Sequence, residues 1–167
     1  MSLNRRPVRV RLRNGRRLSA QVHITEGQSL STFLSTKLHF LNLTDVRWTD
    51  GSADEAMDHL GVRIDQIVWV EPVDPGLHLS SAALPSEETR NVELQVSGAT
   101  GWDRLHVQMN VSRETRMSDY LDANPGFIPL WSVRVVDTGE TVERAALRHG
   151  AIAVIRELEN TDPRRRG

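Results

Sequence analysis

The N-terminal part of the chain alternates between apolar and polar residues. Apolar side chains occupy every second position over residues 8–12, with arginines between them, and a period of two is typical of a strand with one buried face. Asn14 and Gly15 follow, a pair that favours a tight turn because both residues tolerate positive φ. The alternation resumes over residues 18–24, so the pattern predicts a β-hairpin.

The period changes after this hairpin. Leu30, Phe33 and Leu34 have the i, i+3, i+4 spacing that is typical of a short helix with one face on a sheet. The apolar positions that come next predict a third strand over residues 40–48 and a closing hairpin over residues 57–73. We therefore expect the order strand, strand, short helix, strand, strand, strand.

The same order of patterns is found a second time, and the two copies align. With an offset of 87, residues 18–48 align with residues 105–135 without a gap, and 8 of the 31 pairs are identical. We therefore expect a tandem duplication, with a first unit over 8–73, a Pro- and Ser-rich linker over 74–91 and a second unit over 92–158. The identical pairs are Leu18/Leu105, Gln21/Gln108, Ser31/Ser118, Leu34/Leu121, Phe40/Phe127, Leu43/Leu130, Val46/Val133 and Arg47/Arg134.

One segment of the second unit leaves two structures open. Residues 141–148 belong to its closing part, but they contain good helix formers and fit either a strand or a helix. With either assignment the chain is mainly β with short helices. We expect each unit to be a five-stranded small barrel or curled sheet with one short helix. Because a unit of this size is marginally stable by itself, we expect the two to pack as a pseudo-two-fold pair, a pseudo-dimer.

Short boxes recur at equivalent places in the two units. The second unit has Met-Ser-Asp-Tyr-Leu at 117–121, and the first has Leu-Ser-Thr-Phe-Leu at 30–34, with Thr32 in place of Asp. The units close on Ile-Val-Trp-Val at 67–70 and Ile-Ala-Val-Ile at 152–155. With these boxes the chain resembles a group of uncharacterised bacterial proteins, a resemblance that covers both units and implies no particular activity. Its strand–Gly–strand opening is also similar to Sm-like and SH3-like small barrels, and the Sm-like likeness implies RNA binding.

Composition and charge exclude several classes of protein. The 167 residues include no cysteine, which excludes disulfides, thiolate metal sites and cysteine nucleophiles. A net charge of −1 gives no overall attraction to nucleic acid or to an anionic membrane, and no apolar run approaches the roughly 18 residues of a membrane span. Residues 1–7 are basic with no apolar segment after them, so we expect no signal peptide and a cytoplasmic location.

Basic residues concentrate in the first strand and its turn. If the apolar residues of this strand face the core, its arginines form a row on the outer face, where guanidinium groups suit bidentate phosphate contacts. The alternative is a solvated strand face or an edge protected by charge. The second unit favours that alternative, because its equivalent positions are Glu93 and Gln95. The candidate polyanion-binding residues are Arg9, Arg11, Arg13, Arg16 and Arg17.

No motif for catalysis or for cofactor binding is present. The six histidines lack metal-site spacing, and there is no nucleophile elbow, phosphate loop or dinucleotide fingerprint. We therefore predict no catalytic residue, no cofactor and no metal. The first turn of the second unit, which is longer than its counterpart, ends at Trp102. We expect this side chain to be exposed and to contact a partner.

These observations favour a non-enzymatic intracellular interaction or adaptor module, with another protein as its partner and no membrane association. The alternative is an RNA-binding small barrel that uses the basic first strand. A further alternative is small-molecule binding at the seam between the units, because such seams are common positions for pockets. The sequence does not indicate the biological process, the identity of the partner or the oligomeric state.

Overall fold

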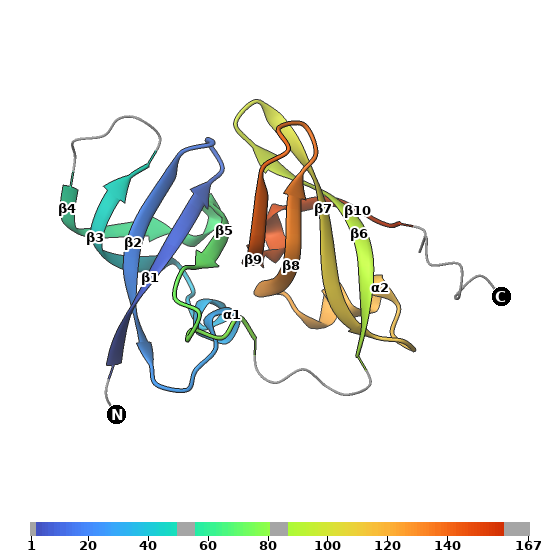
Figure 1. Ribbon diagram of the computed structural model, residues 1–167, viewed down its shortest axis with the longest axis horizontal. Coiled ribbons are helices and arrows are strands. Elements are labelled where there is room, and N and C mark those ends of the chain that lie inside the picture. The colour runs from blue at the N-terminus through green and yellow to red at the C-terminus, as the bar shows by residue number, and fades with distance from the viewer. Residues whose placement is uncertain (1–2, 50–55, 81–86, 159–167) are drawn as a thin grey trace.

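The computed structural model describes residues 3–49, 56–80 and 87–158, which form ten antiparallel strands in one sheet and two short helices (Figure 1). The prediction of a mainly β fold is confirmed. In chain order the elements are β1 (Leu3–Leu12), β2 (Arg17–Thr25), α1 (Leu30–Ser35), β3 (Phe40–Trp48), β4 (Ala56–Arg63), η1 (Ile64–Gln66), β5 (Ile67–Pro72), β6 (Glu87–Gly98), β7 (Gly101–Ser112), α2 (Met117–Ala123), β8 (Phe127–Val135), β9 (Thr141–Arg148), η2 (His149–Ala151) and β10 (Ile152–Glu157), where η marks a 3₁₀ turn.

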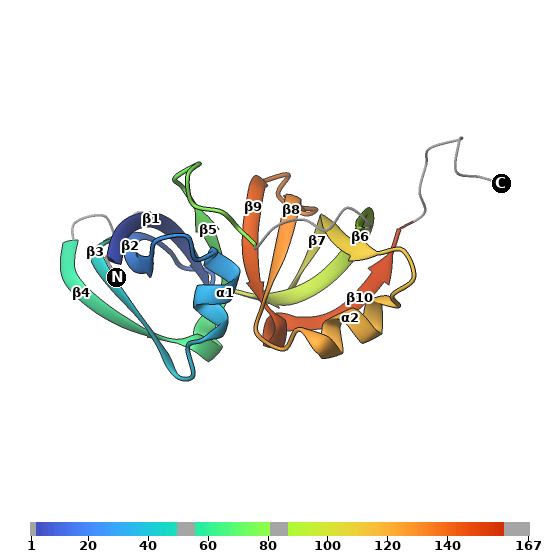
Figure 2. The same cartoon turned by 90° about the horizontal axis from the view of Figure 1, so that it is seen from below.

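The strands follow the order β10-β6-β7-β8-β9-β5-β1-β2-β3-β4. Each half of the chain contributes one continuous part of this sheet, and the element order of the first half recurs in the second. The sheet runs from one outer strand to the other without closing, so the barrel alternative is not confirmed. Both parts of the sheet are strongly curved around a core of their own (Figure 2).

Even the irregularities of the strands occur at equivalent positions. The β2·β3 ladder shifts register between Ser19 and Gln21, and the β7·β8 ladder shifts between His106 and Gln108. Each of the partner strands contains a residue with positive φ, Asp45 at 50° and Ser132 at 51°. Such a conformation costs about 1–2 kcal/mol in a non-glycine residue. The two halves therefore share a strained bulge at the same place, 87 residues apart.

The closing part of each half differs from the expected hairpin. β4 pairs with β3, whereas β5 pairs with β1, because the 3₁₀ turn η1 carries the chain from one border of the half to the other. The prediction of a closing hairpin is therefore wrong. Residues 141–148 form strand β9, in which Ala145, Ala146 and Leu147 are fully buried. Burial between two neighbouring strands outweighs the helix propensity of this segment.

The first part of the expected linker belongs to the first half. Leu77 and Leu79 are buried in its core, and the segment accepts hydrogen bonds from the start of α1 through the carbonyls of His78 and Leu79, at 2.9 and 3.0 Å. These bonds satisfy amide groups that a helix leaves without partners in its first turn. Strand β6 begins at Glu87, so the last residues of the expected linker are extended. Residues 81–86 lie outside the described residues.

The two halves are joined through strands that are not equivalent. β5, the last strand of the first half, pairs with β9, the fourth strand of the second half, with Trp69 opposite Leu147 and Val70 opposite Ala146. A two-fold pair would join equivalent strands, because the same patch forms both sides of a two-fold contact. The expectation of a pseudo-two-fold pair, a pseudo-dimer, is therefore wrong, and the halves are arranged head to tail.

Buried side chains cross this junction in both directions. Phe127 and Ala146 of the second half belong to the core of the first half, and Val68 and Trp69 of the first half belong to the core of the second. Trp69 is only 1% exposed. Each half therefore completes the core of the other, as expected for units too small to be stable alone.

The hairpin tips of the two halves also touch, and this contact can be tested at Gly15. This glycine has φ +84°, and a Cβ added to it would lie 2.6 Å from Cβ of Ala99. We expect Gly15→Ala to lower the free energy of unfolding by about 2–4 kcal/mol, because positive φ and overpacking both oppose the new methyl group. Urea denaturation measures the change.

Gly27 provides the matched control. Its φ is +82°, but nothing lies within 4 Å of an added Cβ, so Gly27→Ala should cost only about 1 kcal/mol. Equal losses in the two variants would show that contact between the tips does not constrain the fold.

Candidate functional site: a cleft at the seam between the halves

The structure does not arrange the predicted row of arginines as one outer surface. Arg11 is only 8% exposed, and its Nη2 donates to Oδ2 of Asp103 at 2.7 Å. Arg17 binds both carboxylate oxygens of Glu140, with Nη2 at 2.6 Å from Oε2. Both acidic residues come from the second half. The charges of Arg11 and Arg17 therefore connect the two halves.

Arg11 is held in the junction by an aromatic ring as well as by charge. Its guanidinium lies 4.6 Å from the ring centroid of Trp69, a geometry that favours a cation–π interaction. Burial lowers the pKa of the Arg11 guanidinium from its usual value, and the carboxylate of Asp103 opposes this shift. Nη1 of Arg11 is buried without a hydrogen-bond partner, 3.8 Å from Oε2 of Glu140.

The other candidate residues lie apart from this network. Arg16 stacks on the ring of Trp48 at 3.6 Å, whereas Arg9 on β1 and Arg13 in the turn after it are exposed. The five candidates are thus divided among different environments. Trp102 is 60% exposed at the start of β7, as expected, and its contact with a partner stays a prediction.

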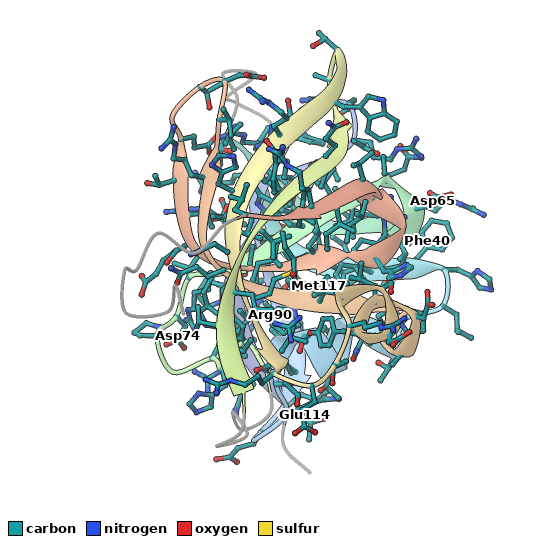
Figure 3. The ribbon with its side chains drawn as sticks, turned by 90° about the vertical axis from the view of Figure 1, so that its right-hand side faces the viewer. Phe40, Asp65, Asp74, Arg90, Glu114 and Met117 are labelled. Atoms are coloured by element: carbon teal, nitrogen blue, oxygen red, sulfur yellow. The ribbon has the colours of Figure 1, made fainter. Side chains whose placement is uncertain are left out.

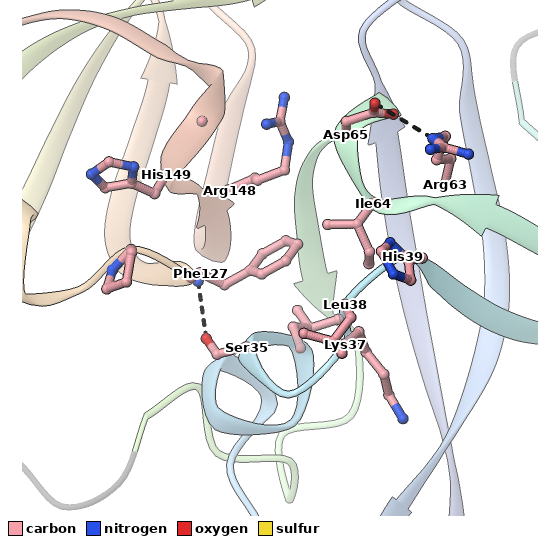
Figure 4. Close-up of a pocket in the computed structure, with 14 residues that line it drawn as sticks. Ser35, Lys37, Leu38, His39, Arg63, Ile64, Asp65, Phe127, Arg148 and His149 are labelled. Atoms are coloured by element: carbon pink, nitrogen blue, oxygen red, sulfur yellow. Dashed lines mark hydrogen bonds and ion pairs between the residues drawn. The ribbon is translucent and has the colours of Figure 1, made fainter.

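A cleft of about 470 Å³ opens at the seam between the halves (Figure 4). One wall comes from the first half, residues 34–35, 37–39 and 63–65, and the other from the second half, residues 125–127 and 148–150. Most of these wall segments align with one another between the two halves of the sequence. Because β5 and β9 are neighbours, corresponding loops of the two halves lie on either side of the cleft.

The floor of the cleft is apolar and is fixed by Ser35. The Oγ of this serine accepts a hydrogen bond from the backbone N–H of Phe127 at 3.0 Å. A Cβ on Gly126 would lie 2.5 Å from the same Oγ, so only glycine permits this approach. Phe127 is buried and Ile64 is half-buried, while Leu38 is 84% exposed at the mouth.

Arg148 is a half-buried cation on the wall. Its Nε donates to the carbonyl of Ile67 at 2.7 Å, and none of the described carboxylates forms an ion pair with it. Burial lowers the pKa of the Arg148 guanidinium, the charge of Arg13 lowers it further, and Asp65 acts in the opposite direction. A partly desolvated guanidinium of this kind is suited to bind an anion.

The other charged residues of the lining strengthen this preference. Lys37 and Arg63 are also part of the walls. Asp65, the one acidic residue among the described lining residues, lies 3.6 Å from Arg63. The cleft thus combines an apolar floor with an excess of cationic groups, and this combination suits a ligand that joins an apolar group to a carboxylate.

No sequence motif marks these cleft residues as a site, although one signal is present. Phe40 and Phe127 are identical in the alignment, and Arg63 aligns with Arg148 at an offset of 85. In each half the phenylalanine lies opposite the arginine on the neighbouring strand. The shared Phe–Arg pair therefore marks one face of each half, but its place in a cleft depends on how the halves pack.

The described part of the chain has neither a metal-binding cluster nor a membrane-spanning helix. No group of three His, Asp or Glu side chains in it is placed to hold a metal ion. No helix in residues 3–49, 56–80 and 87–158 is long and apolar enough to cross a bilayer. Comparisons of the chain with protein-family models, with curated proteins and with solved structures found no match. Its function is therefore inferred from its own geometry.

The ion pairs across the junction can be tested at Asp103. Asp103→Asn leaves the buried Arg11 without its closest carboxylate. We expect a loss of about 2–4 kcal/mol in the free energy of unfolding, below the range for fully buried pairs because the Asp103 side chain is 24% exposed. Chemical denaturation measures this loss.

Asp45→Asn is the matched control, because it breaks the Arg5–Asp45 pair, whose side chains are 56% and 51% exposed. It should cost less than about 1 kcal/mol. A similar, small loss in both variants would contradict a stabilising role for the junction pair.

Proposed function

We propose that this protein is a non-enzymatic cytoplasmic adaptor, built by tandem duplication, whose seam cleft binds a segment of another protein. The bound segment carries an apolar side chain next to a carboxylate, either an acidic residue or a chain end. The observation that carries the proposal is the position of Arg148 beside the apolar floor, with none of the described carboxylates paired to it. An ion pair in a partly desolvated cleft would be stronger than one on an open surface.

Equivalent hydrogen bonds in the two halves support the duplication. The N–H of Ile64 donates to the carbonyl of His39 at 2.8 Å, and the N–H of His149 donates to the carbonyl of Gly126 at 2.9 Å. These two bonds border the cleft and hold its loops in matching conformations. A duplicated adaptor therefore acquires its binding site from two copies of the same loops.

A protein segment fits the mouth of the cleft better than a small molecule does. Leu38 is 84% exposed there, so a partner that covers it would remove apolar surface from water. A small carboxylic acid would fill the cleft and leave this residue in water. Small-molecule binding in the same cleft is the second candidate, because the volume of about 470 Å³ is within the usual range for ligand pockets.

The RNA-binding alternative has less support. Arg11 and Arg17 already bind carboxylates of the second half, so phosphate contacts would have to displace ion pairs. Arg9 on β1 and Arg13 in the turn after it remain exposed, and two exposed cations give only a weak electrostatic attraction.

Peptides that differ in one group test the adaptor proposal. ¹⁵N-labelled protein would be titrated with N-acetyl-Ala-Ala-Leu-Phe, first with a free C-terminal carboxylate and then as the amide, while amide shifts are followed by NMR. We expect the acid to shift the signals of residues 38, 127 and 150, and the amide to bind at least about tenfold more weakly, because a charge-assisted hydrogen bond is lost.

Substitutions on the protein side complete this test. Arg148→Gln should weaken binding of the acid to the level of the amide, because it removes the charge on the wall. Arg134→Gln is the matched control, since Arg134 is an exposed arginine of the second half that does not line the cleft, and it should leave binding unchanged. Equal binding of acid and amide would contradict the proposal. If N-acetyl-leucine bound as tightly as the peptide, the small-molecule alternative would be favoured.

A further inference from the structure

The internal junction joins β5, an outer strand of the first half, to β9, an outer strand of the second half. The strands that correspond to them in the opposite halves lie at the two borders of the sheet. Among the described strands, β10 has β6 as its only neighbour and β4 has β3 as its only neighbour. In the repeat, β10 is equivalent to β5 and β4 is equivalent to β9. The free borders lie toward opposite ends of the molecule (Figures 1 and 2). The chain thus has a second copy of each edge that forms the internal junction, and these second copies have no neighbouring strand among the described residues.

The free strands have the same backbone geometry as the joined ones. Trp69 of β5 lies opposite Arg11, and its equivalent Val154 of β10 lies opposite Gln95, the equivalent of Arg11. Both ladders contain a register shift near the start of the last strand. The edge that β10 presents therefore has the register that allows β5 to pair with β9.

The residues on the free strands also suit the same pairing. At the internal junction, Trp69 and Val70 lie opposite Leu147 and Ala146. The equivalent residues are Val154 and Ile155 on β10, and Val62 and Gly61 on β4. Apolar side chains thus recur on both sides, and a small residue recurs at the position of Ala146. Val154 is 49% exposed, whereas the equivalent Trp69 is buried.

The Phe–Arg pair of the first half shows the same difference in exposure. Phe127 is 6% exposed because the first half covers it, but its equivalent Phe40 is 50% exposed. Phe40 lies at the border of the molecule in Figure 3, and the guanidinium of Arg63 lies 5.5 Å from its ring centroid. Arg148 donates to the carbonyl of Ile67 across the junction, and its equivalent Arg63 is 58% exposed. These residues have the surroundings expected of a half that lacks its neighbour.

We propose that a second copy of this chain adds its β4 to β10 of the first, so that copies join head to tail by repeating the internal β5·β9 junction. In the new junction Val154 lies opposite Val62, and Ile155 lies opposite Gly61. Arg63 donates to the carbonyl of Ile152, and the preceding copy covers Phe40. Because such a contact joins different surfaces, copies add until a ring closes or a filament forms.

The new junction is weaker than the internal one. Gln95 is the equivalent of Arg11, and Arg16 is the equivalent of Asp103. The Arg11–Asp103 ion pair of the internal junction is therefore not repeated between copies. The copies are also not linked covalently, and association costs them translational freedom. We therefore expect a dissociation constant on the order of 10–100 µM, as is typical of small transient interfaces.

Sedimentation equilibrium over about 5 µM to 1 mM protein, a range chosen to bracket that affinity, tests the proposal. The average mass should rise with concentration above the 18.8 kDa of one chain. Val154→Lys and Gly61→Lys each place a charge where the internal junction has a buried residue, and each variant alone should stay monomeric. Leu3→Lys is the matched control, because Leu3 is 61% exposed on β1, and it should assemble like the unmodified protein.

Mixing the two blocked variants identifies the head-to-tail arrangement. The intact β4 of Val154→Lys can pair with the intact β10 of Gly61→Lys, so the mixture should form one-to-one pairs and nothing larger. A Cβ on Gly61 meets only ordinary contacts, at 3.7 Å or more, so this variant should fold. Arg63→Glu, at an exposed residue of the same strand, is a second block that should behave in the same way.

Three results would overturn the proposal. The unmodified protein could stay monomeric at 1 mM, ten times the weakest dissociation constant expected. The mixture of the two blocked variants could stay monomeric. Val154→Lys could abolish assembly while both β4 variants leave it intact, which would indicate a two-fold contact between two β10 strands. Circular dichroism of each variant confirms that a monomer is folded.

Discussion

The pairing of β5 with β9 is the constraint on which the rest of the structure depends. It buries Trp69 between the two halves and places Leu147 opposite it. Because these strands are neighbours, the loops after β4 and β9 come to lie on either side of one cleft. The cleft therefore follows from the head-to-tail pairing, and a two-fold pair of the same halves would not bring these loops together in this way.

The same junction explains the unusual charge of the first strand. An arginine at the position of Arg11 would normally lie in solvent, but here the second half covers it, so its burial requires a counter-charge. Asp103 and Glu140 provide that charge from the second half. The equivalent residue of the second half is Gln95, on the strand next to the free border. The difference between the two halves thus matches their places in the sheet. The junction explains the burial of Arg11, whereas Arg9 of the same strand stays exposed.

The sequence predicted local structure well because local structure depends on neighbouring residues. The alternation over residues 8–12, the turn at Gly15 and the short helix at Leu30 all lie where the pattern placed them. The strands that join the two halves could not be predicted, because any outer strand with apolar residues can pair with another along its free edge. Residues 141–148 fitted either a strand or a helix, because their structure is decided by burial beside β5, which lies far away in the sequence. A pocket at the seam was one expectation, but its residues could not be named, because they are far apart in the sequence and meet only through this pairing.

A head-to-tail junction has a consequence that a two-fold junction lacks. A two-fold pair uses the same surface of both units and leaves nothing to extend, whereas pairing β5 with β9 leaves β10 and β4 without neighbours among the described strands. Natural proteins protect such edges with charge, yet Val154 leaves an apolar side chain 49% exposed on this edge. Charges are present beside it, but Arg156 and Glu157 have opposite signs, so they do not repel a partner as a whole. The free edge of β10 is thus poorly protected against pairing with another strand. This is expected if a second copy of the chain covers it.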